Sequence, residues 1–175
     1  GSGFQLKQRL SKMLKVTPSN LTLGNGSNDV LELIVRAFVQ PGEGVVVSAH
    51  AFAVYVLSAS AAGAKVQEVP ARNWGHDLDA MFGMIDRETR VVFIANPNNP
   101  TGTWVTSTKL RQFRDALPSQ VIAVVDEAYF EYVEEAEYPD CIEMLPIYPN
   151  LIVTRTFSKI YGLAGLRVGY AIASE

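Results

Sequence analysis

Short runs rich in strand-forming residues recur along this chain, and they constrain its fold more than any other feature. Six such runs occupy residues 45–47, 66–69, 91–94, 121–125, 151–153 and 168–172, and several of them are continuously apolar. Segments with apolar residues at helical spacing lie between most of them, at 53–62, 78–85 and 106–117. Because strands that are buried on both faces are apolar throughout, this alternation predicts a three-layer α/β/α sandwich around a mostly parallel, mixed sheet.

The first forty residues add three shorter elements. Leu6, Leu10 and Leu14 recur at helical spacing and predict a helix that ends before Pro18. A short strand over 21–23, a turn over 24–27 and a second amphipathic helix over 31–38 are expected to follow. We interpret residues 1–3 as a cloning scar and residues 4–175 as the core of one domain.

The composition of the 175-residue chain excludes several classes of protein. Hydrophobic residues make up 48% and charged residues 19%, which is typical of a well-packed globular protein. A formal net charge of -3 gives no broad attraction for nucleic acid or anionic membranes, and no apolar run is long enough for a transmembrane helix. The single cysteine, Cys141, fits a reducing cytoplasm. No metal site is predicted, because His50 and His76 lack metal-ligand spacing with each other or with Cys141.

Polar segments follow the predicted strands, and their positions indicate where a ligand would bind. In open α/β sheets, ligands lie beyond the carboxyl ends of the strands. The polar segments at those ends are residues 24–28, 48–52, 96–102, 126–129 and 154–159. We therefore expect five segments that are far apart in the sequence to meet at one edge of the sheet.

Asp126 directly follows the apolar run at 121–125, so its carboxylate is expected to emerge from a buried strand. Burial of a carboxylate is costly unless a cation or a strong hydrogen-bond donor faces it. Two interpretations are open. Asp126 either caps a helix or lies in a surface turn, or it faces a protonated ring nitrogen and thereby preserves an electron sink in a bound cofactor.

Two segments offer groups that bind phosphate. The stretch GNGSND, residues 24–29, places Ser27 and Asn28 at the start of a helix, where free N–H groups and the helix dipole attract anions. The stretch TFSKIYGLAGLRVG, residues 156–169, adds two hydroxyls and the guanidinium of Arg167. Its glycines permit sharp turns or close packing. The alternative is that Arg167 is only a surface charge. Neither the dinucleotide-binding G-x-G-x-x-G pattern nor a P-loop occurs.

Further polar and aromatic groups are expected at the same edge. The segment NPNNPTG, residues 96–102, combines rigid prolines with asparagines that can present fixed donors. Tyr129 lies three residues after Asp126 and is positioned to place a phenol beside that carboxylate. Phe52 follows the strand at 45–47, where its ring either stacks on a planar ligand or packs in the core.

The four segments GNGSND, NPNNPTG, VVDEAYFEY and TFSKIYGLAGLRVGY occur in an order that resembles the fold-type I pyridoxal-phosphate aminotransferases. The resemblance covers residues 4–175 and is greatest to the histidinol-phosphate aminotransferases. It implies that Lys159 bonds covalently to the aldehyde of pyridoxal 5'-phosphate and moves a proton. It also implies that Asp126 pairs with the ring nitrogen, and that Asn99 and Tyr129 hydrogen-bond the phenolic oxygen. Phe52 falls at the ring-stacking position, where a tyrosine is more usual.

The resemblance also implies a seat for the cofactor phosphate. The residues at the matching positions are Gly26, Ser27, Asn28, Thr156, Ser158 and Arg167.

The implied activity is transfer of an amino group from histidinol phosphate to 2-oxoglutarate, a step of histidine biosynthesis catalysed by a cytoplasmic homodimer. Aromatic amino-acid aminotransferases and pyridoxal-phosphate decarboxylases of phosphorylated amino acids share this core, so both stay open. A non-catalytic, reduced cofactor-binding module is the alternative of another class. Members of the family are substantially longer than this chain. We therefore expect that an N-terminal segment and a small C-terminal domain are absent, and that the chain alone has little or no transaminase activity.

Overall fold

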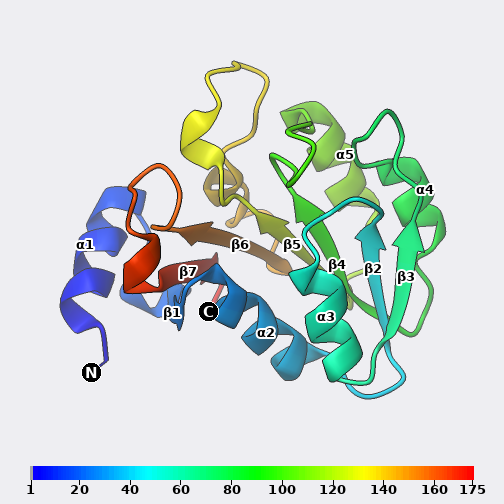
Figure 1. Ribbon diagram of the computed structural model, residues 1–175, viewed down its shortest axis with the longest axis horizontal. Coiled ribbons are helices and arrows are strands. Elements are labelled where there is room, and N and C mark those ends of the chain that lie inside the picture. The colour runs from blue at the N-terminus through cyan, green and yellow to red at the C-terminus, as the bar shows by residue number, and fades with distance from the viewer. Residues whose placement is uncertain (1) are drawn as a thin grey trace.

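Seven strands pair into one mixed sheet in the computed structural model, which describes residues 2–175 (Figure 1). The strands are β1 (Leu21–Asn25), β2 (Gly44–Ser48), β3 (Lys65–Val69), β4 (Thr89–Ala95), β5 (Ile122–Asp126), β6 (Leu151–Thr156) and β7 (Val168–Ala173). Their order across the sheet is β1-β7-β6-β5-β4-β2-β3. Neighbours from β6 to β3 are parallel, whereas β7 is antiparallel to both β1 and β6. The mostly parallel, mixed sheet is therefore confirmed.

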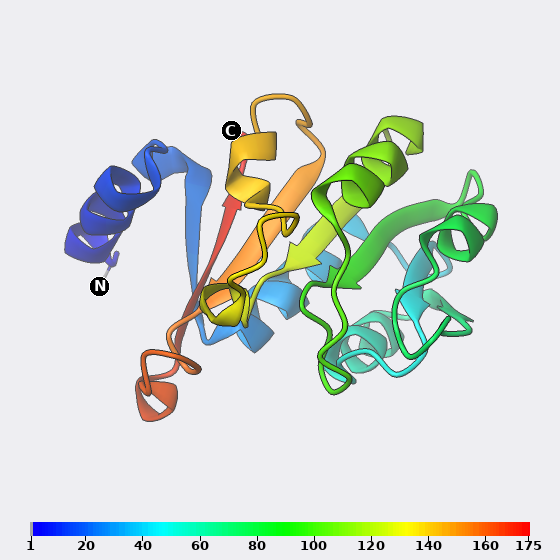
Figure 2. The same cartoon turned by 90° about the horizontal axis from the view of Figure 1, so that it is seen from above.

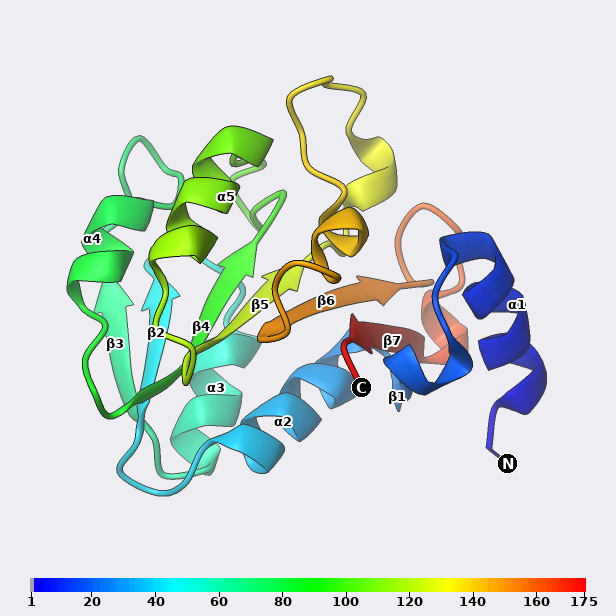
Figure 3. The same cartoon turned by 180° about the vertical axis from the view of Figure 1, so that it is seen from behind.

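Helices cover both faces of this sheet and complete the three layers (Figures 1 and 3). The α-helices of the described residues are α1 (Phe4–Leu14), α2 (Ser27–Phe38), α3 (Val54–Ala61), α4 (Leu78–Gly83) and α5 (Ser107–Ala116). Short 3-10 turns are η1 (Pro18–Asn20), η2 (Phe130–Tyr132), η3 (Cys141–Met144) and η4 (Ala164–Leu166). Helices α2 and α3 lie on one face and α4 and α5 on the other, while α1 packs at the β1 edge (Figure 2). Within residues 2–175 no helix combines the length and the apolar character needed to cross a membrane.

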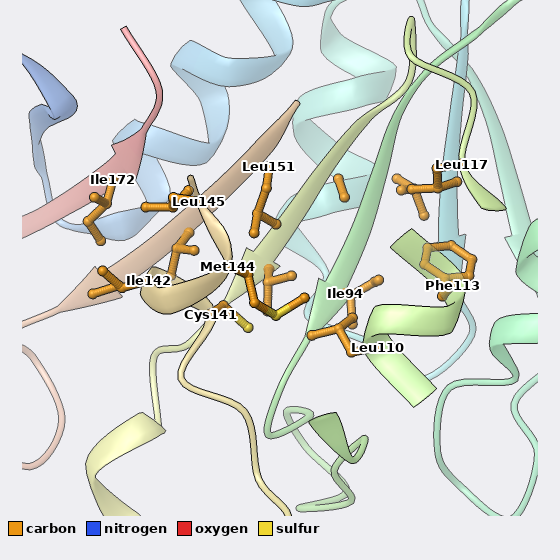
Figure 4. Close-up of a cluster of buried hydrophobic side chains, with 14 of the residues drawn as sticks. Ile94, Leu110, Phe113, Leu117, Cys141, Ile142, Met144, Leu145, Leu151 and Ile172 are labelled. Carbon is orange, nitrogen blue, oxygen red and sulfur yellow. The ribbon is translucent and has the colours of Figure 1, made fainter. Parts of the chain in front are cut away.

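Each face of the sheet has its own hydrophobic cluster, as the two-residue period of a strand requires. In β5, Val125 belongs to the cluster under α5 and η3, whereas Val124 belongs to the cluster under α2 and α3. Figure 4 shows the first cluster, in which Leu110 and Phe113 of α5 and Met144 of η3 cover the sheet. Both faces of β5 are covered, in agreement with its apolar residues 122–125, and Asp126 at its carboxyl end is buried.

The turn expected over residues 24–27 is wrong in its extent. Gly24 and Asn25 belong to β1, where they pair with Gly169 and Val168 of β7. Helix α2 already begins at Ser27, so the change of direction is confined to Gly26. Gly26 has φ 85° and ψ 169°, a conformation that is essentially restricted to glycine. Pairing with a strand more than 140 residues later in the chain, which no local pattern signals, extends β1 up to this glycine.

A buried ion pair fixes the segment after β5 to the neighbouring strand. Arg155 of β6 donates from Nε and Nη2 to Glu127 Oε2 at 2.9 and 2.7 Å, and the two side chains are 6% and 0% exposed. The same guanidinium donates to Asp140 Oδ1 at 2.9 Å and lies 3.7 Å from the ring centroid of Phe130. The backbone N–H of Cys141 donates to the other oxygen of Glu127 at 3.1 Å. Glu127 and Arg155 therefore hold both ends of the loop that connects β5 to η3.

We expect Glu127→Ala to lower the free energy of unfolding by about 3–5 kcal/mol, because it leaves the guanidinium of Arg155 buried without its main partner. The matched control is Glu32→Ala, which removes a solvent-exposed ion pair to Arg36 in α2. That control should change the free energy of unfolding by less than about 0.5 kcal/mol. Urea denaturation followed by circular dichroism measures both values. Equal losses of unfolding free energy in the two variants would show that the buried Glu127–Arg155 pair stabilises the fold no more than the exposed Glu32–Arg36 pair.

Candidate active site

The carboxyl ends of the parallel strands surround a cavity of about 270 Å³. Its walls come from the start of α2, the loop after β2, α3, the loop after β4, the end of β5 and the connection between β6 and β7. All but one of the site residues selected from the sequence line it, namely Ser27, Asn28, Phe52, Asn99, Asp126, Tyr129, Thr156, Ser158, Lys159 and Arg167. The exception is Gly26, which lies directly against Arg167. The expected meeting of five distant segments is thus observed.

Asp126 is buried at the end of β5, with 4% of its surface exposed. Its Oδ2 accepts a hydrogen bond from the Tyr55 hydroxyl at 2.7 Å, and its Oδ1 accepts one from the Thr154 hydroxyl at 2.9 Å. Burial raises the pKa of Asp126 above its usual value, while these hydrogen bonds, the N–H of Ala128 and the charge of Lys159 oppose the rise. The surface-turn interpretation of Asp126 is therefore wrong, because the carboxylate is buried and held by groups from α3 and β6.

Another part of the cavity lining is suited to an anion. The N-terminus of α2 lies there with Ser27, and Arg167 donates from Nη1 to Ser158 Oγ at 3.4 Å and to the carbonyl of Ala164 at 2.9 Å. A Cβ on Gly26 would lie 2.2 Å from Nη2 of Arg167. Glycine at this position therefore lets the guanidinium approach the first turn of α2, so that a fixed charge and a helix N-terminus face the same space.

The NPNNPTG loop uses its asparagines in different ways. Asn96 is buried and exchanges hydrogen bonds with the backbone of Val105, at 3.2 Å from Nδ2 and 2.7 Å to Oδ1. Asn98 donates to the carbonyl of His50 at 3.1 Å and to the hydroxyl of Thr101 at 2.8 Å. These two side chains hold the loop in place. Among the three asparagines, Asn99 alone lines the cavity.

Lys159 lies in the connection between β6 and β7, and its side chain reaches across to the segment after β5. Its Nζ is 5.1 Å from the ring centroid of Tyr129. Both residues line the cavity together with Asp126, whose carboxylate is influenced by the lysine charge. The cavity therefore combines an amine, a phenol and a buried carboxylate.

Comparison with known proteins identifies the family. Residues 4–175 match the family described as aminotransferase class I and II. The chain belongs to this family. It is 54% identical over 175 residues to histidinol-phosphate aminotransferase 2 of Pseudomonas aeruginosa, with 100% of this chain and 47% of the relative covered. Identity to histidinol-phosphate aminotransferase 2 of Methylococcus capsulatus is 56% over 178 residues, with 98% and 48% covered.

Solved structures of aminotransferases and related enzymes have the same fold. Histidinol-phosphate aminotransferase from Sinorhizobium meliloti, in complex with pyridoxal-5'-phosphate, superimposes with a TM-score of 0.93 at 36% identity, covering 99% of this chain and 47% of that one. L-threonine-O-3-phosphate decarboxylase from Porphyromonas gingivalis gives a TM-score of 0.84 at 25% identity, covering 99% and 52%. The chain spans about half the length of the curated relatives it matches.

Sequence reasoning missed the two hydroxyls that hold Asp126. Tyr55 falls in the helix expected over 53–62, where an aromatic residue is more often part of the core. No helical pattern signals its partner, because Phe52, three residues earlier, precedes the helix. Thr154 directly follows the apolar run at 151–153 and is buried within β6. A polar residue in a strand covered on both faces indicates a buried partner.

Substitution of Gly169 tests how closely β7 packs against the start of α2. A Cβ at Gly169 would lie 2.3 Å from the backbone nitrogen of Ser27, whereas nothing lies within 4 Å of one at Gly165. We expect Gly169→Ala to lower the free energy of unfolding by about 2–3 kcal/mol, because backbone atoms must move apart. Gly165→Ala should change it by less than about 0.5 kcal/mol. Urea denaturation of both variants measures the difference, and equal stabilities would contradict the close approach of β7 to α2.

Proposed function

We propose that this chain is the cofactor-binding core of an aminotransferase that uses pyridoxal 5'-phosphate. In the whole protein, the proposed reaction transfers the amino group of histidinol phosphate to 2-oxoglutarate. The observation that carries the proposal is one cavity that joins the amine of Lys159, the buried carboxylate of Asp126 and the anion-binding part at Arg167. Membership of the aminotransferase family supports it.

The residues present fit this cofactor. Thr156, Ser158 and Arg167 offer hydroxyl and guanidinium donors for a phosphate, next to the N-terminus of α2. A methyl group on Gly26 would overlap the guanidinium of Arg167, so the position of Arg167 against the first turn of α2 depends on glycine. Asp126 is a carboxylate that can accept a hydrogen bond from a protonated ring nitrogen. The cavity lining thus offers both cationic and anionic groups, as a phosphorylated pyridinium requires.

Four other side chains of the cavity lining have distinct roles in the proposed reaction. When bound, pyridoxal phosphate supplies an aldehyde that bonds to amines and a ring that accepts electrons. Lys159 would provide the Nζ for that covalent bond and, when not bonded to the cofactor, would accept and return a proton as a general base. Asn99 and Tyr129 offer an amide N–H and a phenol O–H for the phenolic oxygen. Phe52 offers a ring face for stacking.

The choice of substrate rests on the relatives. Two curated relatives named histidinol-phosphate aminotransferase are 54% and 56% identical to this chain, whereas the phosphothreonine decarboxylase is 25% identical. An aromatic amino-acid aminotransferase would share the same cavity and is distinguished only by a substrate test. The reaction would involve an amino donor and a 2-oxo acid acceptor, and the whole enzyme is proposed to be a cytoplasmic homodimer, as the family resemblance implies.

Borohydride trapping tests the role of Lys159. The 175-residue chain should form a covalent adduct with pyridoxal phosphate that borohydride reduction makes permanent. Lys159→Ala should abolish it, because Lys159 is the only lysine that lines the cavity in the described part of the chain. Lys109→Ala is the matched control, since this lysine lies on α5 away from the cavity. Visible absorption and the mass of the modified peptide measure the adduct. Equal labelling of Lys159→Ala and the control would contradict the assignment.

A substrate panel tests the proposed reaction in the protein extended to the length of its relatives. Histidinol phosphate should be converted with a kcat/KM at least about tenfold higher than that of aromatic amino acids, equivalent to about 1.4 kcal/mol of transition-state binding. Release of CO2 from phosphothreonine would instead indicate a decarboxylase. A trapped adduct without turnover of any of these amines would favour a non-catalytic cofactor-binding module.

A further inference from the structure

The hydroxyl of Tyr55 is a buried polar group that lines the cavity but has no task in the reaction proposed above. Tyr55 is 0% exposed, and its hydroxyl lies 2.7 Å from Oδ2 of Asp126. An ionised carboxylate can only accept hydrogen bonds, so the phenol is the donor. Burial raises the pKa of Tyr55 well above its usual value, and the charge of Asp126 adds to the rise. The phenol therefore stays protonated and available as a donor.

The ring of Tyr55 is fixed by neighbouring aromatic rings independently of its hydrogen bond. It stacks on Phe93 of β4, with ring centroids 4.7 Å apart and planes inclined by 4°. Phe52 meets it edge to face, at 5.7 Å and 86°. Two ring contacts define the orientation of a side chain that has only two main rotatable bonds. The position of the hydroxyl is therefore set by packing in the core, and the carboxylate of Asp126 must adjust to it.

Thr154 completes the arrangement from a different element. Its hydroxyl, on β6, lies 2.9 Å from Oδ1 of Asp126, so each carboxylate oxygen has a hydroxyl donor. Hydrogen bonds to an ionised group favour the ionised form and restrict its rotation. Neither donor carries a charge that would neutralise Asp126. The carboxylate thus keeps its negative charge for a cationic partner in the cavity.

We propose that Tyr55 is a positioning residue, whose phenol acts together with the hydroxyl of Thr154 to hold the Asp126 carboxylate ionised and in a fixed orientation. Tyr55 would act on the cofactor only through Asp126. The inference therefore rests on the proposed function, in which Asp126 faces the ring nitrogen.

Three titratable groups influence Asp126 or its donor. Tyr55 acts on it from α3 by hydrogen bonding, and Lys159 acts on it by its charge from the β6–β7 connection. Tyr129, in the segment after β5, acts on Tyr55. Burial raises the pKa of Asp126, and the donors oppose the rise. Removal of one donor must therefore raise the pKa of this carboxyl further.

The test is the titration of Asp126 in the 175-residue chain without added cofactor, followed by carbon-13 NMR of its carboxyl group. Asp126→Asn assigns the signal. Tyr55→Phe keeps the stacked ring and removes only the hydroxyl, and we expect it to raise the midpoint of the Asp126 titration by about one pH unit or more. An unchanged midpoint in folded Tyr55→Phe would overturn the inference, because a purely structural role for the ring moves no titration.

The matched control is Tyr148→Phe. The Tyr148 hydroxyl donates to Asp115 Oδ1 at 2.7 Å, the same length as the Tyr55–Asp126 bond, but this pair lies at the surface and away from the cavity. The control should leave the Asp126 midpoint unchanged. A shift of equal size in Tyr148→Phe would show that the effect of Tyr55→Phe is not local, and would also overturn the inference.

A second pair of variants covers the case in which Tyr55→Phe does not fold. Thr154→Val removes the other hydroxyl donor, whereas Thr154→Ser retains it. We expect a raised Asp126 midpoint in Thr154→Val and a restored one in Thr154→Ser. Equal midpoints in these two variants would overturn the joint role of the two hydroxyls.

Failure of the inference and failure of the proposed function give different results. A wild-type chain that forms no adduct at Lys159 contradicts the proposed function, while the Asp126 titration is measured without cofactor and is unaffected. A chain that forms the adduct, but whose Asp126 midpoint does not respond to Tyr55→Phe, contradicts only the role of Tyr55.

Discussion

A carboxylate buried at the end of a central strand is the constraint on which the rest of the site depends. Asp126 lies at the end of β5, with β4 and β6 on either side and hydrophobic clusters on both faces of the strand. Burial without partners would favour the neutral acid. Hydroxyl donors from α3 and β6 stabilise the ionised form of Asp126. Both elements must therefore lie where their hydroxyls can reach this carboxylate.

The cavity lining carries charges of both signs. The N-terminus of α2, Arg167 and Lys159 supply positive charge, and Asp126 supplies negative charge. A ligand that carries a phosphate and a cationic ring can pair with both. Glu127 adds no negative charge to the cavity, because Arg155 and the N–H of Cys141 engage its carboxylate on the side of η3.

Local patterns were sufficient for the elements of the fold and for most of the cavity lining. Apolar, β-branched runs predicted most of the strands. Because parallel strands have their carboxyl ends at one edge of the sheet, the polar segments after them were expected to meet there, with Lys159 and Asp126 in the same site. The extent of β1, the direction of β7 and the bond from Tyr55 to Asp126 were not predictable. Each depends on residues that are distant in the sequence, such as Tyr55 and Asp126, which are 71 positions apart, and periodicity carries no information about such pairs.

The position of β7 determines when the cavity can exist. This strand lies between β1 and β6, and it is the only strand that pairs with β1 in the described part of the chain. The pairing joins Leu21 to Ile172, a contact between nearly opposite ends of the sequence, which is slow to form because a long loop must close first. During synthesis from the N-terminus, α2 is made before β6 and β7, and it packs on both of them as well as on β1. Arg167 directly precedes β7, so the anion-binding part of the cavity is completed only after Asp126 and Lys159 have been made.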